Sequence, residues 1–191
     1  MRQIQTLMFL SLAAMLLVGC GGGAKTMQSA ETGDIPDWYL NVPRDPNYLF
    51  AVNTATSQDL QLAFDKAITA ARAEIGRQVE VKINALQKRF EEETGAGADA
   101  QILSSFTQAT KTVVSTSLSG SRVSKQKQLR DGNMWRAYVL VEYPVGAANE
   151  ALMQQIKQNE RMYTKFRESQ VFKELDEETK KYDEWKKQQN Q

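Results

Sequence analysis

Residues 48–90 read YLFAVNTATSQDLQLAFDKAITAARAEIGRQVEVKINALQKRF and decide the fold. The run Tyr48–Val52 is apolar, aromatic and branched, which predicts a strand. Thr56 and Asp59 then have the spacing of a capping box, in which both side chains satisfy free backbone amides at a helix start. Apolar residues at helical spacing predict one long helix that ends near Thr94. Its apolar stripe contains Leu60, Phe64, Ala67, Ile68, Ala71, Ile75, Val79, Ile83, Leu86 and Phe90.

The rest of the domain supplies a second helix and a hairpin. Asp99–Leu118 carries apolar residues on one side and predicts the helix. The pattern then changes period, and the Asp-Gly pair within Arg130–Asn133 is typical of a hairpin turn. Met134–Tyr143 alternates apolar and polar residues and predicts a strand that Pro144 ends. Together these elements predict an α+β domain, in which helices cover a small antiparallel sheet.

The first arm of this hairpin, Ser121–Leu129, is mostly polar. Lys125 and Lys127 within it are typical of a charged edge strand that resists pairing with further strands. We expect the long helix and the last strand to bury a common core between them. The core residues expected on the two facing surfaces are Phe64, Ile68, Ile75, Trp135 and Val139.

The C-terminal segment 147–191 is highly charged with both signs and predicts a long helical arm, formed by one helix or a pair. Its apolar positions change frame near Ser169 and Gln170, so no single stripe continues along it. Two interpretations stay open: the arm packs on its own domain, or it pairs with another copy or a partner. On the second interpretation, deleting Val171–Gln191 leaves thermal unfolding nearly unchanged and lowers the mass measured in sedimentation.

The N-terminus has the features of an export signal, with Arg2 followed by the apolar stretch Met8–Leu17. That stretch is shorter than the roughly 20 apolar residues that span a bilayer. It leads into Leu17-Val18-Gly19-Cys20, which resembles a bacterial lipobox and contains the only cysteine of the chain. We therefore expect lipid attachment at Cys20, through a diacylglycerol thioether and an acylated amine that together anchor the protein durably. The alternative is a plain secretory signal with an incidental cysteine.

These features divide the chain into four parts. They are a signal peptide at 1–19, a lipidated flexible tether at 20–34, an α+β domain at 35–146 and a charged amphipathic C-terminal helix at 147–191. Gly21 rather than an aspartate follows Cys20, which resembles the lipoprotein signal for export to the outer membrane. The expected location is the bacterial outer membrane, with the lipid-anchored domain facing the periplasm or the cell surface.

Composition argues against several classes of function. The 191 residues contain 24 Lys and Arg against 23 Asp and Glu, a balance that argues against broad electrostatic capture of nucleic acid. The sequence has no histidine, so the usual general base and metal ligand are missing. One cysteine excludes an intramolecular disulfide and a cysteine-rich metal centre. We expect no catalytic residue, cofactor, metal site or small-molecule substrate.

Three groups of residues could still carry a function, and each has a structural alternative. Glu91–Glu93 could contribute to a divalent-ion site, but consecutive helical positions diverge, which favours a solvated helix end. Trp38 and Tyr39 could form a platform that stacks on a ligand, or could close over the end of the core. A basic group could bind anionic lipid headgroups or glycan, or could protect the sheet edge. It consists of Lys111, Arg122, Lys125, Lys127, Arg130 and Arg136.

Several stretches resemble one family of small bacterial lipoproteins. They are Pro36-Asp37-Trp38, Tyr48–Val52, Ala70–Glu74 and Trp135–Val139. Over roughly residues 35–143 the chain is similar to the LPP family. That family is typified by a twenty-kilodalton surface lipoprotein and includes the flagellar outer-membrane lipoprotein FlgP. The resemblance implies a fold and a cellular address, and it implies no reaction.

We therefore expect a non-enzymatic, lipid-anchored cell-envelope protein that assembles with itself or with an envelope protein partner. Within the resemblance, the alternative is a component of a flagellar or secretion-associated outer-membrane ring. An alternative of another class is a periplasmic chaperone-like holder, which would expose apolar clefts and bind unfolded clients broadly.

Overall fold

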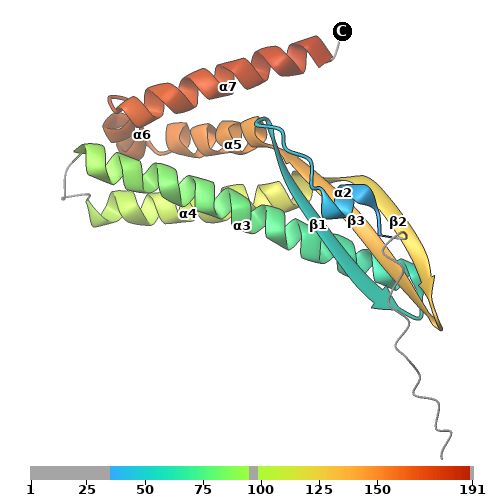
Figure 1. Cartoon of the computed structure of the whole chain (residues 1–191). Coiled ribbons are helices and arrows are strands. Elements are labelled where there is room, and N and C mark those ends of the chain that lie inside the picture. Colours follow the sequence, from blue (N-terminus) through green and yellow to red (C-terminus); the bar gives the residue numbers. More distant parts are fainter. Residues whose placement is uncertain (1–34, 95–98, 190–191) are drawn as a thin grey trace, which may run out of the picture. The chain divides into compact units, whose positions relative to one another are not determined.

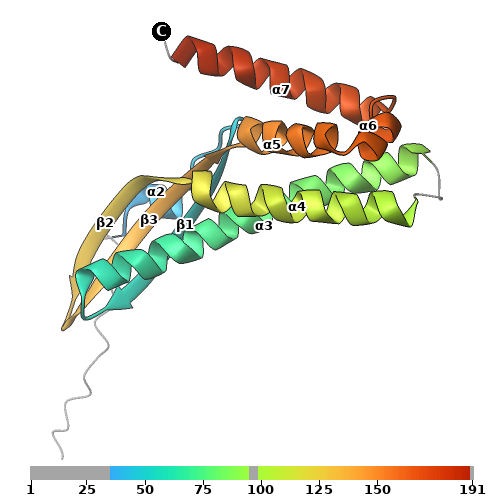
Figure 2. The same ribbon diagram turned by 180° about the vertical axis from the view of Figure 1, so that it is seen from behind.

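A three-stranded antiparallel sheet, with the strand order β1-β3-β2, organises the computed structural model, which describes residues 35–94 and 99–189. The strands are β1 (Tyr48–Ser57), β2 (Arg122–Asp131) and β3 (Met134–Pro144). The predicted turn joins β2 to β3, and Gly132 adopts the positive φ of 59° that this turn requires. Helix α3 (Leu60–Thr94) crosses one face of the sheet, and α2 (Asp37–Leu40) lies on the other (Figure 1, Figure 2). The predicted α+β class is confirmed.

Strand β3 is buried on both faces, which the alternating pattern of its sequence does not predict. Tyr138 and Glu142 point away from α3 and are nevertheless buried. The cause is α2, whose Tyr39 meets the ring of Tyr138 edge to face at 5.0 Å between centroids. The central strand therefore separates two apolar layers, a large one beneath α3 and a small one beneath α2.

Helix α3 begins later than the predicted capping box, because β1 continues to Ser57 and includes Thr56. Asp59 is the residue that caps the helix, with its Oδ1 accepting the Leu62 amide at 2.7 Å. Ser57 Oγ accepts the Asp59 amide at 3.2 Å and fixes the turn between strand and helix. The assignment of Thr56 as a cap was therefore wrong, since that residue belongs to the sheet.

The buried stripe of α3 begins with small residues. Ala63, Ala67 and Ala71 are fully buried against the sheet, and larger side chains continue the stripe where the helix leaves it. Of the expected core residues, Ile75 and Val139 are buried as predicted. The other three, Phe64, Ile68 and Trp135, are only half-buried at the edge of the core.

Helix α4 (Ala100–Gly120) confirms the second predicted helix and runs beside α3. Asp99 caps it, since its side chain accepts the Gln101 amide at 3.0 Å. A Cβ at Gly76 would lie 3.0 Å from Leu118 Cδ2, so glycine permits the close approach of the two helices there.

The C-terminal segment forms three helices rather than one or two. They are α5 (Val145–Gln158), α6 (Glu160–Phe166) and α7 (Gln170–Gln189). Asn159 caps α6, and Ser169 Oγ accepts the Phe172 amide at 3.1 Å at the start of α7. The change of frame near Ser169 in the sequence therefore coincides with a real break between helices.

Aromatic rings join these helices to the domain. The ring of Phe166 lies 4.4 Å from Phe90 and 5.5 Å from Phe106, and Phe172 of α7 meets Phe166 at 6.0 Å. Val171 and Leu175 of α7 are buried, and α7 lies along α5 (Figure 1). Of the two open interpretations, the structure shows packing on the chain's own domain. This packing argues against the expectation that Val171–Gln191 is dispensable for folding.

The burial of the aromatic residues predicts two unequal losses of stability. Phe166→Ala removes a fully buried ring and should lower the free energy of unfolding by about 3–5 kcal/mol. Phe64→Ala, the matched control at a half-buried position on α3, should lower it by about 1–2 kcal/mol. Urea unfolding followed by circular dichroism measures both. Equal losses would show that the two rings contribute alike to the core.

Deletion of Val171–Gln191 should destabilise the domain. It removes the buried Val171 and Leu175 and uncovers one side of Phe166. At about 1.5–3 kcal/mol for each buried apolar side chain, the midpoint of thermal unfolding should fall by more than about 10 °C. A midpoint within about 3 °C of the parent protein would instead show that α7 is loosely attached.

Candidate functional site

The predicted lipid attachment residue, Cys20, lies outside the residues that the structure describes. The signal peptide 1–19 and the tether 20–34 lie outside them as well, so lipidation stays a prediction. Over residues 35–94 and 99–189, no helix is both long enough and apolar enough to span a bilayer.

The described residues contain no group of side chains that is arranged as a metal centre would be. Among them, no three acidic, cysteine or histidine side chains gather as metal ligands would. In the same part of the chain, every buried polar side-chain atom has a hydrogen-bond partner.

The acidic run at the end of α3 has a structural task. Glu91 accepts a hydrogen bond from Gln87 at 2.8 Å, and Glu92 pairs with Lys88 at 3.8 Å. Glu93 reaches α7, where it accepts the Gln170 amide at 2.5 Å and the Val171 amide at 3.3 Å. A carboxylate at a helix N-terminus satisfies free amides and opposes the positive end of the helix dipole. Sequence spacing could not reveal this contact, because the partners are far apart in the chain.

Three members of the basic group have partners within the domain. Arg122 pairs with Glu142 at 2.6 Å, and Arg136 pairs with Asp131 at 2.6 Å. The hydrogen bond to Asp131 raises the pKa of the Arg136 guanidinium above its usual value. Arg130 stacks over the ring of Trp135 at 4.7 Å from its centroid. These contacts favour the structural interpretation of the group.

Trp38 and Tyr39 also have a structural role. Both lie on α2 and are half-buried, and Tyr39 packs on Tyr138 as described above. They cover the outer face of β3 rather than the end of the core beneath α3. This second apolar layer is a detail that neither interpretation of the sequence included.

The two edges of the sheet differ in chemistry. β2 has five charged residues among ten, Lys125 and Lys127 included, and a break in register between Val123 and Lys125. Charges and irregularities of this kind resist the addition of another strand. β1 forms the opposite edge and has no charged residue in its ten, YLFAVNTATS. The predicted edge strand β2 is therefore an edge, and β1 is a second edge without charged residues.

The outward main-chain groups of β1 belong to its even-numbered residues. The Tyr48 amide donates to Asp45 O at 3.1 Å, and the Thr54 amide donates to its neighbour Asn53 Oδ1 at 2.8 Å. The Phe50 carbonyl accepts Gln78 Nε2 from α3 at 3.1 Å. None of these three partners lies on β3. Because main-chain direction alternates along a strand, the groups of Val52 and Thr56 also point away from β3.

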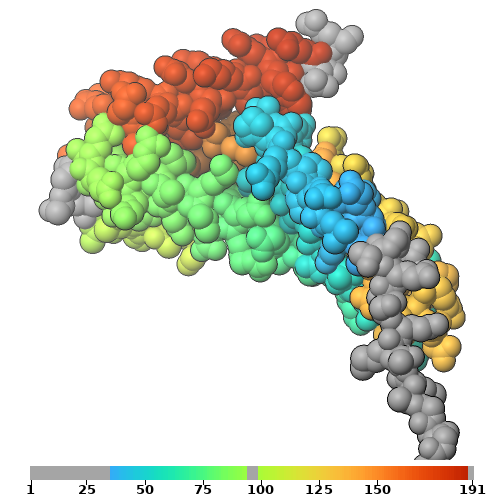
Figure 3. Space-filling view, viewed as in Figure 1, coloured from blue at the N-terminus to red at the C-terminus, as the bar shows by residue number. Residues whose placement is uncertain are grey.

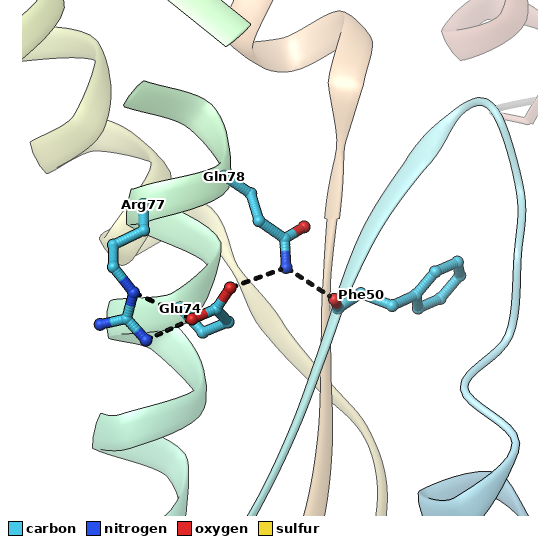
Figure 4. A network of polar contacts seen from close by, with 4 residues as sticks. All are labelled: Phe50, Glu74, Arg77 and Gln78. Atoms are coloured by element: carbon cyan, nitrogen blue, oxygen red, sulfur yellow. Dashed lines mark hydrogen bonds and ion pairs between the residues drawn. The ribbon is translucent and has the colours of Figure 1, made fainter. Parts of the chain in front are cut away.

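Side chains of α3 close part of this edge. Gln78 stands on the helix beside Glu74, which it contacts at 3.4 Å and which also pairs with Arg77 (Figure 4). Beyond Phe50 the described residues supply one more cap, the Asn53 side chain. Apart from the Thr54 amide, the stretch from Val52 to Ser57 therefore keeps the outward main-chain groups that an added strand would bind. The spacing of the sequence could not reveal this, because strand order decides which strand is an edge.

Comparison with known proteins adds one finding. Neither the curated proteins nor the solved structures gave a match. A family model, that of the LPP20 lipoproteins, matches residues 36–143. This range contains α2, the three strands, α3 and α4, and it ends before α5. Because the match covers more than half of the chain, the protein belongs to the LPP20 lipoprotein family.

Proposed function

We propose that this protein is a lipid-anchored, non-enzymatic lipoprotein of the outer membrane that assembles through the free edge of β1. Its family is one of cell-envelope lipoproteins, which supports a location in the cell envelope. The lipobox-like Cys20 and the Gly21 that follows it support the anchor and the outer membrane.

The observation that carries the assembly is the contrast between the two sheet edges. An extended segment from another molecule can hydrogen-bond to the outward groups of Val52 and Thr56 and to the Thr54 carbonyl, and so extend the sheet, whereas the Thr54 amide already donates to Asn53 Oδ1. The charged residues of β2 disfavour strand addition at the other edge, so an added strand would pair with β1. A second copy of the chain suits β1, because two uncharged strands pair without repulsion.

Ring assembly in the envelope would need a different contact, because two β1 edges that pair with each other close a dimer and leave no open edge for a third copy. A chaperone-like holder receives less support. Five large apolar residues are exposed in the described chain: Leu40 and Val42 at and just after the end of α2, Leu62 and Val81 far apart on α3, and Met134 at the start of β3. A holder would need them in one continuous cleft.

Cys20→Ala tests the anchor. Without a thiol no thioether can form, so the variant should accumulate as a precursor or as a soluble periplasmic form. Fractionation of cells followed by mass spectrometry of the protein measures both. A Cys20→Ala protein that is still mature and membrane-bound after a high-salt wash would refute lipid anchoring at this residue.

Val52→Pro tests the edge. The Val52 amide points away from β3, so proline removes an outward donor and leaves the bonds to β3 intact. The mass-average molar mass in sedimentation should fall toward that of one chain, whereas the matched control Val52→Thr should assemble like the parent protein. Circular dichroism verifies that both variants fold. A folded Val52→Pro protein with unchanged assembly would exclude the β1 edge as the contact.

A further inference from the structure

A cavity of about 310 Å³ lies where the family-matched part of the chain meets its C-terminal helices. Its walls come from the loop before β1, from the middle of α3, from the start of α5 and from the last turns of α7. Figure 3 shows this face, with the loop before β1 in cyan beside the red surface of α7. The family match ends at Tyr143, so this pocket needs the helices that lie beyond the match.

Three aromatic rings line the cavity. Tyr48 meets Trp185 edge to face with 6.2 Å between centroids, and Tyr182 stacks on Trp185 at 5.5 Å. All three rings are half-buried, so part of each remains accessible. Aromatic residues of the domain core are instead buried, as Phe106 and Phe166 are. A cluster of incompletely covered rings inside a concave surface is typical of a binding site.

The wall that α7 contributes is held in a fixed position. A Cβ at Gly146 would lie 2.2 Å from Cγ of Tyr182, so only glycine lets this ring rest on the first turn of α5. Lys186 joins the helices by donating to Glu150 at 2.7 Å, and it also pairs with Asp183 at 2.9 Å. Burial at this contact raises the pKa of the Tyr182 hydroxyl. The rings are thus positioned before any ligand arrives.

The polar groups of the pocket offer both donors and acceptors. Asn149 Nδ2 donates to Glu178 Oε2 at 2.7 Å, which holds the two planar groups together and leaves their other oxygens to accept. Lys82 and Lys181 also line the cavity, and neither forms a salt bridge with any described residue. Two lysines against one glutamate leave the lining with one net positive charge.

We infer that this pocket binds a carbohydrate, and that a sugar with one carboxylate binds better than a neutral one. The apolar face of a pyranose can stack on the accessible rings of Tyr48 and Trp185. Its hydroxyls can donate to Glu178 and Asn149, and its carboxylate can accept from Lys82 and Lys181.

A proline-rich peptide is the other ligand class that aromatic grooves bind. Such a peptide presents a row of carbonyl acceptors and no backbone donor at proline. It would therefore leave the oxygens of Glu178 and Asn149 without donors when it displaced their water. The pair of acceptors favours a hydroxyl-rich ligand.

The test uses the mature full-length protein in detergent micelles and isothermal titration calorimetry. The acidic probe is the disaccharide of N-acetylglucosamine and N-acetylmuramic acid, the neutral probe is chitobiose, and the peptide probe is decaproline. We expect saturable binding of the acidic disaccharide with a Kd of about 0.1–1 mM, and weaker binding of chitobiose. Trp185→Ala should weaken the binding by about tenfold or more, whereas Trp185→Phe should retain most of it.

Two matched lysine variants distinguish the effect of a charge in the pocket from the effect of the overall charge of α7 on binding. Lys181→Gln should weaken binding of the acidic disaccharide several-fold and leave chitobiose unchanged. Lys173→Gln, on the same helix and outside the cavity, should change neither. Circular dichroism of each variant shows whether α7 is still folded. Lys181→Gln is an exposed substitution, so it tests the pocket even where Trp185→Ala disturbs the helix.

Three results would overturn the inference. The first is no saturable heat for either sugar up to about 10 mM. The second is binding of decaproline in competition with the sugar, which would assign the pocket to a peptide. The third is equal weakening by Lys181→Gln and Lys173→Gln, which would show that the sugar responds to overall charge. None of these results bears on the edge of β1, so the proposed assembly is tested separately.

Discussion

The contact on which the structure depends is the close approach of α3 to the sheet. Ala63, Ala67 and Ala71 present almost no side chain, so the helix backbone can lie near β1 and β3. The larger residues that follow, such as Ile75 and Val79, bury their volume where α4 joins the packing. Because its buried side chains are small at the start and larger further on, α3 packs against the sheet at its start and against other helices at its end.

The C-terminal helices pack against the far end of α3, beyond the sheet. The rings of Phe90, Phe106 and Phe166 come from three helices and form one cluster beyond the sheet, against which α7 adds Phe172. Glu93 caps α7 from the end of α3, so the same helix that organises the sheet also fixes where the last helix begins. A helix that is mostly charged is thereby held by a few buried side chains, by the two amide hydrogen bonds to the Glu93 carboxylate and by polar contacts to α5.

Local patterns in the sequence predict the elements well and their surroundings poorly. Apolar spacing predicts α3 and α4, and the Asp-Gly pair predicts the β2–β3 turn, because these signals depend on near neighbours. The same spacing predicts that Phe64 lies in the core, but Phe64 is only half-buried. The helix face that is fully buried carries Ala63, Ala67 and Ala71 instead. The burial of Tyr138 depends on α2, and the free edge of β1 depends on strand order. Both are tertiary facts that periodicity does not encode.

The two surfaces to which functions are proposed use different parts of β1. Tyr48 lines the cavity at the start of the strand, whereas the open edge begins at Val52. Between them, the hydrogen bond from Gln78 to the Phe50 carbonyl closes the edge. A strand that adds at Val52–Ser57 therefore stops short of the pocket, because the next outward acceptor toward Tyr48 is already occupied. In the proposed assembly, this contact would therefore keep the added strand away from the cavity that Tyr48 lines.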